Sequence, residues 1–137
     1  MIIPLTSADD PRLAPYRGVK ERDLLRNAQR FIVEGKVTLT RLVEASRFPV
    51  ESVFLAENRV GPLTALLAKL GPAVPVYTAP QCVMDGITGF HIHRGVLAVA
   101  RREAEQTVED LTATLPAGPL TLLALIALSN HDNVGAC

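Results

Sequence analysis

Between residues 31 and 100 the chain alternates short aliphatic runs with amphipathic stretches, and this alternation limits the possible folds more than any other feature. The aliphatic runs have the length of strands and occupy residues 31–35, 52–57, 74–78 and 95–100. The stretches between them predict helices at 37–48, 62–70 and 80–86. The last run is apolar on both faces, which is typical of a buried strand. We therefore expect an α/β fold, a layered sandwich with a mostly parallel central sheet.

Three other segments flank this region. Residues 1–19 contain three prolines and a glycine and predict an irregular N-terminal segment, so the expected domain covers residues 20–101. Residues 102–119 carry four acids, two prolines and one glycine with little apolar content. That composition is typical of a linker, within which residues 107–111 predict a short helical turn.

Residues 120–137 combine an apolar run with a polar turn. The run from Leu120 to Leu128 is too short for a bilayer, which needs about 20 residues, and it predicts a buried strand. A lone apolar strand beyond a linker would promote aggregation. We therefore expect residues 120–137 to be the truncated start of a second α/β domain.

Composition indicates a globular protein, because 48% of residues are hydrophobic and 20% are charged. Net charge is zero, which excludes a global attraction to nucleic acid, but residues 1–50 hold nine Lys/Arg against six Asp/Glu. Cys82 and Cys137 lack metal or redox spacing and fit a reducing compartment. The N-terminal sequence has no apolar core of signal length. A cytoplasmic protein is expected.

Residues 20–30 predict a helix with a basic stripe. Arg22, Arg26 and Arg30 recur every four residues and would share one face. The stripe is either an ordinary solvated face or a surface for RNA phosphates.

Three stretches carry a resemblance to a known family. They are "RFIVEGKVTLTRLVEASRFPVESVFLAE" (30–57), "RGVLAVARR" (94–102) and "SNHDNVGAC" (129–137). In this order they resemble the SpoU (TrmH-like) branch of the SPOUT RNA 2′-O-ribose methyltransferases. That family begins with an F-x-x-E-G strand, closes its substrate-binding domain on a G-V-L-A strand, and then reaches the catalytic-domain motif D-x-x-N-x-G-A. The match spans about residues 9–137, with His131-Asp132 where the family often has Asp-Pro.

The resemblance implies a two-part enzyme. Residues 20–101 would be an RNA substrate-binding domain similar to RNA-binding ribosomal proteins, and residues 120–137 would begin a knotted methyltransferase domain. The full protein would transfer a methyl group from S-adenosylmethionine to a ribose 2′-hydroxyl of ribosomal or transfer RNA, as a homodimer formed through the knotted domain. No membrane association is expected.

The family motif also implies roles for individual residues. Asn133 matches the catalytic-motif asparagine and Gly135 the motif glycine, although Asn133 equally suits a helix N-cap. The family's catalytic arginine and cofactor loops would lie beyond residue 137, so the chain alone is expected to be inactive. RNA would be bound by basic residues, the candidates being Arg22, Arg26, Arg30, Lys36, Arg41 and Arg94. We expect shape and backbone recognition more than base stacking, with Phe31 and Phe54 in the core and Tyr16 and Phe90 exposed.

Other residues suggest weaker alternatives. His91 and His93 could ligate a metal with Cys82, but a complete site needs further ligands, so no metal is expected. Glu34 could be a general base or a structural carboxylate. Two rival functions are a stand-alone RNA-binding protein of ribosomal-protein-like fold, and a small metabolic enzyme using the histidines and Asp85.

Overall fold

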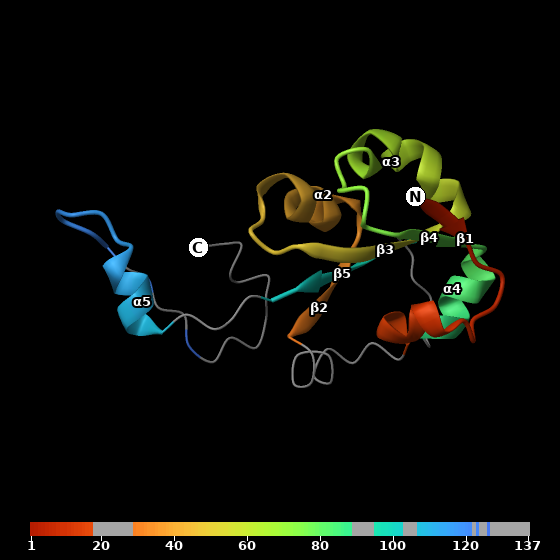
Figure 1. Ribbon diagram of the computed structural model, residues 1–137, viewed down its shortest axis with the longest axis horizontal. Helices are drawn as coiled ribbons and strands as arrows, with labels where there is room; N and C mark the ends of the chain where they lie inside the picture. Colours follow the sequence, from red (N-terminus) through yellow and green to blue (C-terminus); the bar gives the residue numbers. More distant parts are fainter. Residues whose placement is uncertain (18–28, 89–94, 103–106, 122, 124–125, 127–137) are drawn as a thin grey trace. The chain divides into compact units, whose positions relative to one another are not determined.

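The computed structural model describes residues 1–17, 29–88, 95–102, 107–121, 123 and 126. The chain divides into two compact units, Met1–Ala104 and Glu105–Cys137. The strands of the first unit are β1 (Ile2–Pro4), β2 (Arg30–Glu34), β3 (Val50–Ala56), β4 (Val76–Ala79) and β5 (Val96–Arg101) (Figure 1). Its helices are η1 (Pro11–Tyr16), α2 (Lys36–Ala45), η2 (Glu57–Arg59), α3 (Val60–Leu67) and α4 (Gln81–Thr88).

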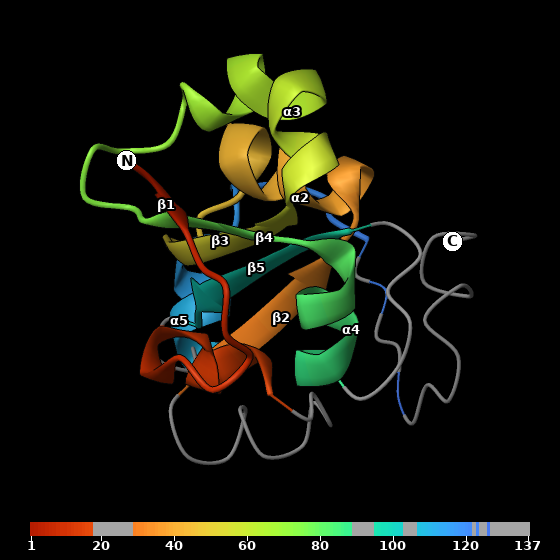
Figure 2. The same cartoon turned by 90° about the vertical axis from the view of Figure 1, so that its right-hand side faces the viewer.

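The five strands form one sheet in the order β1-β4-β3-β5-β2, with β1 and β2 at its edges. Helices α2 and α3 cover one face, and η1 and α4 cover the other (Figure 1 and Figure 2). A separate apolar core fills the space on each face. The predicted layered α/β sandwich is therefore confirmed.

The expectation of a mostly parallel sheet is wrong. β4 runs parallel to both β1 and β3, but β5 runs antiparallel to both β3 and β2. The start of β5 lies beside the ends of its neighbours, since Ala56 N–H donates to the Gly95 carbonyl and Gly35 N–H to the Val96 carbonyl. Hydrophobic alternation predicts where strands lie but carries no information on their direction.

Gly95 is required at this entry to the sheet. Its φ is +58°, and a Cβ there would stand 3.0 Å from the Ala56 Cβ. An L side chain would therefore combine backbone strain with a clash in the core.

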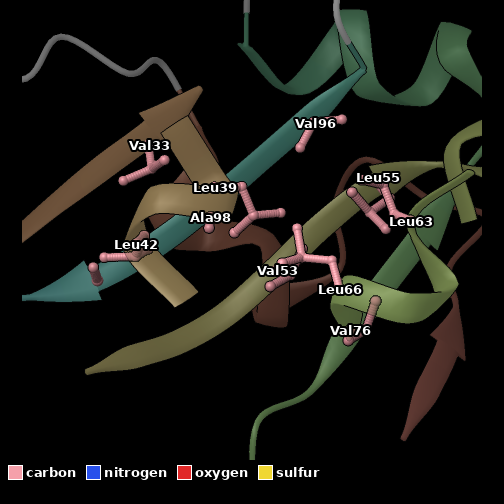
Figure 3. Close-up of a cluster of buried hydrophobic side chains, with 11 residues drawn as sticks. Val33, Leu39, Leu42, Val53, Leu55, Leu63, Leu66, Val76, Val96 and Ala98 are labelled. Carbon is pink, nitrogen blue, oxygen red and sulfur yellow. The ribbon is translucent and has the colours of Figure 1, made fainter. Parts of the chain in front are cut away.

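The core under α2 and α3 is built from aliphatic side chains at helical spacing. Leu39 and Leu42 of α2, with Leu63 and Leu66 of α3, project onto the sheet (Figure 3). Gly35, with φ of +88°, turns the chain from β2 into α2, and its carbonyl accepts the Leu39 N–H. The predicted F-x-x-E-G strand and its following helix are thereby confirmed as β2 and α2.

Residues 1–17 contain a strand and a 3₁₀ helix, whereas residues 1–19 were predicted to be irregular. β1 adds an edge strand beside β4, and η1 places Leu13 and Tyr16 in the second core, both fully buried. The Tyr16 hydroxyl lies 2.7 Å from the Ser52 Oγ, and its ring packs on Phe54. Burial raises the pKa of the Tyr16 hydroxyl. Tyr16 was expected to be exposed, because prolines predict an irregular segment. Pro11 is instead the first residue of η1, where a proline is tolerated, and Pro15 lies inside the same short 3₁₀ helix.

The second unit contains one short described helix, α5 (Val108–Ala113), close to the predicted helical turn. Thr107 and Asp110 form a capping box at its start, and hydrogen bonds from Thr107 lower the pKa of Asp110. Of the predicted strand at 120–128, only Leu120, Thr121, Leu123 and Ile126 are described; none lies in a strand, and the three hydrophobic residues are exposed. The predicted domain boundaries stay predictions.

Among the described residues, no helix is long and apolar enough to cross a membrane.

Candidate nucleic-acid interface

Several predicted site residues lie outside the described part of the chain. These are Arg22, Arg26, Arg94, Asn133 and Gly135, together with His91 and His93. Arg30, Lys36 and Arg41 are described.

Arg30 begins strand β2, so the prediction that it completes a helical stripe with Arg22 and Arg26 is wrong. Its guanidinium instead pairs with Glu51, the Nε–Oε2 distance being 2.5 Å. Glu51 lies at a register shift in β3. Arg101 of β5 binds the other oxygen at 2.8 Å. Two arginines therefore share one carboxylate, and these three side chains together carry one positive charge.

Lys36 and Arg41 belong to the same helix but not to the same surface. They are five positions apart along α2, which places their side chains about 140° apart around the helix axis. Arg41 faces the β2 edge of the sheet, whereas Lys36 begins the helix at the opposite end of β2 from Arg30. The structure thus brings Arg41 to a surface that Lys36 does not share.

A groove of about 470 Å³ lies along the edge formed by β2 and α2. Its floor is apolar, and Val33 of β2 and Leu42 of α2 connect it to the core (Figure 3). The described residues that line it are Phe31, Val33, Thr38, Arg41, Leu42, Ala45, Ser46, Arg47 and Phe48. None of these lining residues is acidic.

Two phenylalanines and an arginine form the end of this groove. Phe31 and Phe48 meet edge to face, with ring centroids 5.2 Å apart and an angle of 82° between the ring planes. The Arg47 guanidinium carbon lies 5.2 Å from the centre of the Phe48 ring, within cation–π range. Both rings are half-buried and pack against the core under α2 and α3, where Phe31 was expected. The groove therefore presents aromatic rings and positive charge side by side.

A second arginine–aromatic pair lies on the other face of the sheet. Arg12 of η1 stands 6.0 Å from the centre of the Tyr77 ring. Its guanidinium donates two hydrogen bonds to Asp10, at 2.9 and 2.7 Å. These hydrogen bonds lower the pKa of Asp10 to about 2. The charge of this arginine is already matched by a carboxylate.

Sequence reasoning missed Arg47, Phe48 and Arg101 as site residues. A faint signal existed, since "SRFP" places an arginine and an aromatic residue beside Pro49, in the segment that follows α2. Nothing in the sequence indicated that Phe31, seventeen positions earlier, would meet Phe48.

The remaining candidates form no catalytic site in the described residues. Glu34 is exposed at the end of β2. Asp85 accepts a hydrogen bond from Gln81 at 2.7 Å. The described part of the chain contains no group of three metal-ligating side chains.

Comparison with known proteins places this geometry in context. No protein-family profile matches the chain. It is 36% identical over 132 residues to proteins named uncharacterized tRNA/rRNA methyltransferases in Mycobacterium bovis and Mycobacterium tuberculosis. The aligned region is 93% of this chain and 43% of each relative. The chain therefore spans less than half of their length.

The fold is shared with a solved enzyme. The rRNA methyltransferase of Sinorhizobium meliloti matches 76% of this chain with a TM-score of 0.56 and 15% identity, over 38% of its own length. A second structure of that protein, with AdoMet bound, matches equally well. These matches show a common fold for the α/β unit.

Proposed function

We propose that this chain is the RNA-binding part of an S-adenosylmethionine-dependent RNA methyltransferase of the SpoU branch of the SPOUT family. The proposed reaction is methylation of a ribose 2′-hydroxyl in ribosomal or transfer RNA. The observation that carries the proposal is the 36% identity to named tRNA/rRNA methyltransferases across nearly the whole chain. The basic, aromatic groove between β2 and α2 supports an RNA-binding role for this part.

The proposal places methyl transfer in a longer protein. Asn133 and Gly135 would belong to the first motif of a knotted domain, which would also supply the homodimer contact and the remaining cofactor loops. S-adenosylmethionine supplies an activated methyl group in such enzymes. The groove described above does not suit this cofactor, because Arg41 and Arg47 would stand beside its positively charged sulfonium. The same arginines suit an RNA phosphate. The protein is proposed to be cytoplasmic.

The RNA-binding part of the proposal can be tested with the 137-residue chain. Total transfer RNA and total ribosomal RNA serve as probes in filter binding between 50 and 300 mM KCl. Binding should weaken steeply with salt, and replacing Arg41 and Arg47 by alanine should reduce the slope of log Kobs against log salt by roughly 0.7 to 0.9 per lost phosphate contact. Alanine at Arg22 and Arg26 tests the predicted stripe in the same assay. Binding that ignores salt and all four substitutions would contradict an RNA-binding role.

The enzymatic part needs the protein extended to the full length of its reading frame. Tritiated S-adenosylmethionine should label RNA in the presence of the extended protein, while the 137-residue chain should give background. A 2′-O-methyl group blocks alkaline cleavage of the adjacent phosphodiester, so the label should appear in alkali-resistant dinucleotides. Label in mononucleotides would show methylation of a base and contradict the 2′-O assignment.

A further inference from the structure

We propose that strand β2 pairs antiparallel with β2 of a second copy of this chain, which joins the sheets of the two copies across a twofold axis. The pairing is centred on Ile32, so that Arg30 of each copy lies opposite Glu34 of the other. This contact goes beyond the proposed RNA-binding function and does not depend on it. It is also separate from the homodimer contact proposed for the knotted domain.

Strand β2 presents an unused row of backbone hydrogen-bonding groups. It ends the sheet and pairs, among the described strands, only with β5 (Figure 2). Directly after β2, Gly35 N–H donates to the Val96 carbonyl of β5. Because hydrogen-bonded and non-hydrogen-bonded pairs alternate, Arg30, Ile32 and Glu34 direct their N–H and C=O groups away from β5. No backbone hydrogen bond joins these groups to another residue in the part of the chain that the structure describes.

The two edges of the sheet differ in how they are protected against pairing. Edge strands commonly avoid another strand by being short, or by carrying a proline or a charge. β1 has only three residues and ends on Pro4. β2 has five residues and no proline, and its three central residues, Phe31 to Val33, are apolar. β2 is therefore the edge to which a further strand can be added.

The charges at the two ends of β2 favour an antiparallel copy of the same strand. Its sequence, RFIVE, begins with a cation and ends with an anion. A copy centred on Ile32 places Arg30 opposite Glu34 twice, whereas a parallel copy would place like charges side by side. Glu34 is exposed, and Arg30, Arg101 and Glu51 together carry one positive charge. Glu34 of the second copy would neutralise that charge.

The same register gives the apolar groove an occupant. Side chains of directly opposed residues lie on the same face of a sheet, so Phe31 of one copy and Val33 of the other would be neighbours on the face covered by α2. Both residues line the groove of about 470 Å³, whose floor is apolar. The added strand would therefore cover apolar surface beside β2 that a single copy leaves open to water.

The test measures association of the 137-residue chain, free of RNA, by sedimentation velocity at increasing protein concentration. The wild type should shift from 14.7 kDa to twice that mass. Glu34→Arg and Arg30→Glu each place like charges opposite one another twice, and each should weaken dimerisation roughly tenfold. An equimolar mixture of the two variants should dimerise as the wild type does, because every cross-strand pair is then of opposite charge.

The matched control is Glu57→Arg, which makes the same charge change at an exposed residue of η2. It should leave dimerisation unchanged. A loss equal to that of Glu34→Arg would show that net charge, and not the pairing of β2, controls association, and would overturn the proposal.

A wild-type measurement guards against variants that fail to fold. Amide hydrogen exchange, followed by NMR at low and high protein concentration, should slow at Arg30, Ile32 and Glu34 as dimers form. The amides of Phe31 and Val33 face β5 in either state and should change little.

Three results would overturn the proposal. They are a monomer at every concentration, a dimer that the mixture of variants fails to restore, and a dimer without slower exchange at the outward amides of β2. None of them affects RNA binding, which the filter assay measures separately.

Discussion

The two faces of the sheet each carry an arginine beside an aromatic ring, and the two pairs differ in what surrounds them. On the face covered by η1 and α4, Arg12 lies over Tyr77 and is held by Asp10 through two hydrogen bonds. On the face covered by α2, Arg47 lies over Phe48 at the end of a groove whose lining residues include no carboxylate. The same pair of residue types thus lies beside a carboxylate of its own segment on one face and lines an apolar groove on the other. Both pairs consist of an arginine and an aromatic ring, so they differ only in the residues that surround them.

The largest effect expected is on the stability of the face that carries the groove. Leu39 of α2 is 1% exposed and packs in the core beneath the helix. Leu39→Ala should lower the free energy of unfolding by about 3 kcal/mol, because it leaves a cavity between α2 and the sheet. Urea denaturation measures this loss.

The matched control for this substitution is Val37→Ala on the same helix. Val37 is 73% exposed, so its truncation should change the free energy of unfolding by less than about 0.5 kcal/mol. Equal losses from the two variants would mean that α2 does not pack on the sheet as described.

The next largest effect should separate the two arginine–aromatic pairs directly. Arg47→Glu replaces attraction by repulsion at the groove, and we expect the Kd for total transfer RNA at 50 mM KCl to rise roughly 30-fold, which is about 2 kcal/mol. Arg12→Glu makes the same charge change on the opposite face and should alter the Kd less than about threefold. Filter binding gives both values, and similar increases would show that net charge, not the groove, controls affinity.

A smaller effect concerns the hydroxyl pair that Tyr16 and Ser52 form in the second core. Tyr16→Phe removes the partner of the buried Ser52 hydroxyl and should cost about 1–2 kcal/mol of unfolding free energy. Ser52→Ala should largely suppress that loss in the double variant, because no unpaired buried hydroxyl then remains. Additive losses in the double-mutant cycle would show that the two hydroxyls do not interact.

The smallest effect is on the pH dependence of stability that the Arg12–Asp10 pair contributes. Hydrogen bonds from Arg12 hold the pKa of Asp10 at about 2 in the folded protein, below its ordinary value of 3.8. A depressed carboxyl pKa stabilises the fold above the ordinary value, and that contribution is lost as pH falls from about 4 through about 2. The stability difference between the wild type and Asp10→Asn should therefore be constant above pH 4 and shrink below it in acid-dependent urea denaturation. A difference that persists unchanged at pH 2 would contradict the pairing.

Much of the fold was predictable because it depends on local pattern. Leucines at helical spacing predicted α2 and α3, since burying such a stripe is what stabilises a short helix. The glycine after "FIVE" likewise predicted the end of β2, and its φ of +88° explains why glycine occupies that position. The N-terminal strand β1 was missed, because three residues at an edge carry too little periodicity to be recognised.

The candidate site was only partly predictable. The basic residues of the first fifty positions suggested an anionic partner. The predicted RNA-binding role of Arg41 stays a prediction, and the structure adds that Arg41 lines a groove. Arg30 was assigned to a helix, although it begins a strand and shares Glu51 with Arg101, fifty positions beyond that carboxylate. Ion pairs of this kind connect strands that are distant along the chain, and they leave no signature in the sequence.

The sequence by itself determined the α/β layering, the positions of the central strands and helices, and a resemblance to RNA methyltransferases that the named relatives support. Only the tertiary structure decided the antiparallel direction of β5, the burial of Tyr16 and the meeting of Phe31 with Phe48. The physical reason is that helices and strands report their own periodicity, while direction, burial and side-chain encounters depend on which elements become neighbours. The groove exists because β2 is an edge strand, and strand order is a property of the folded sheet.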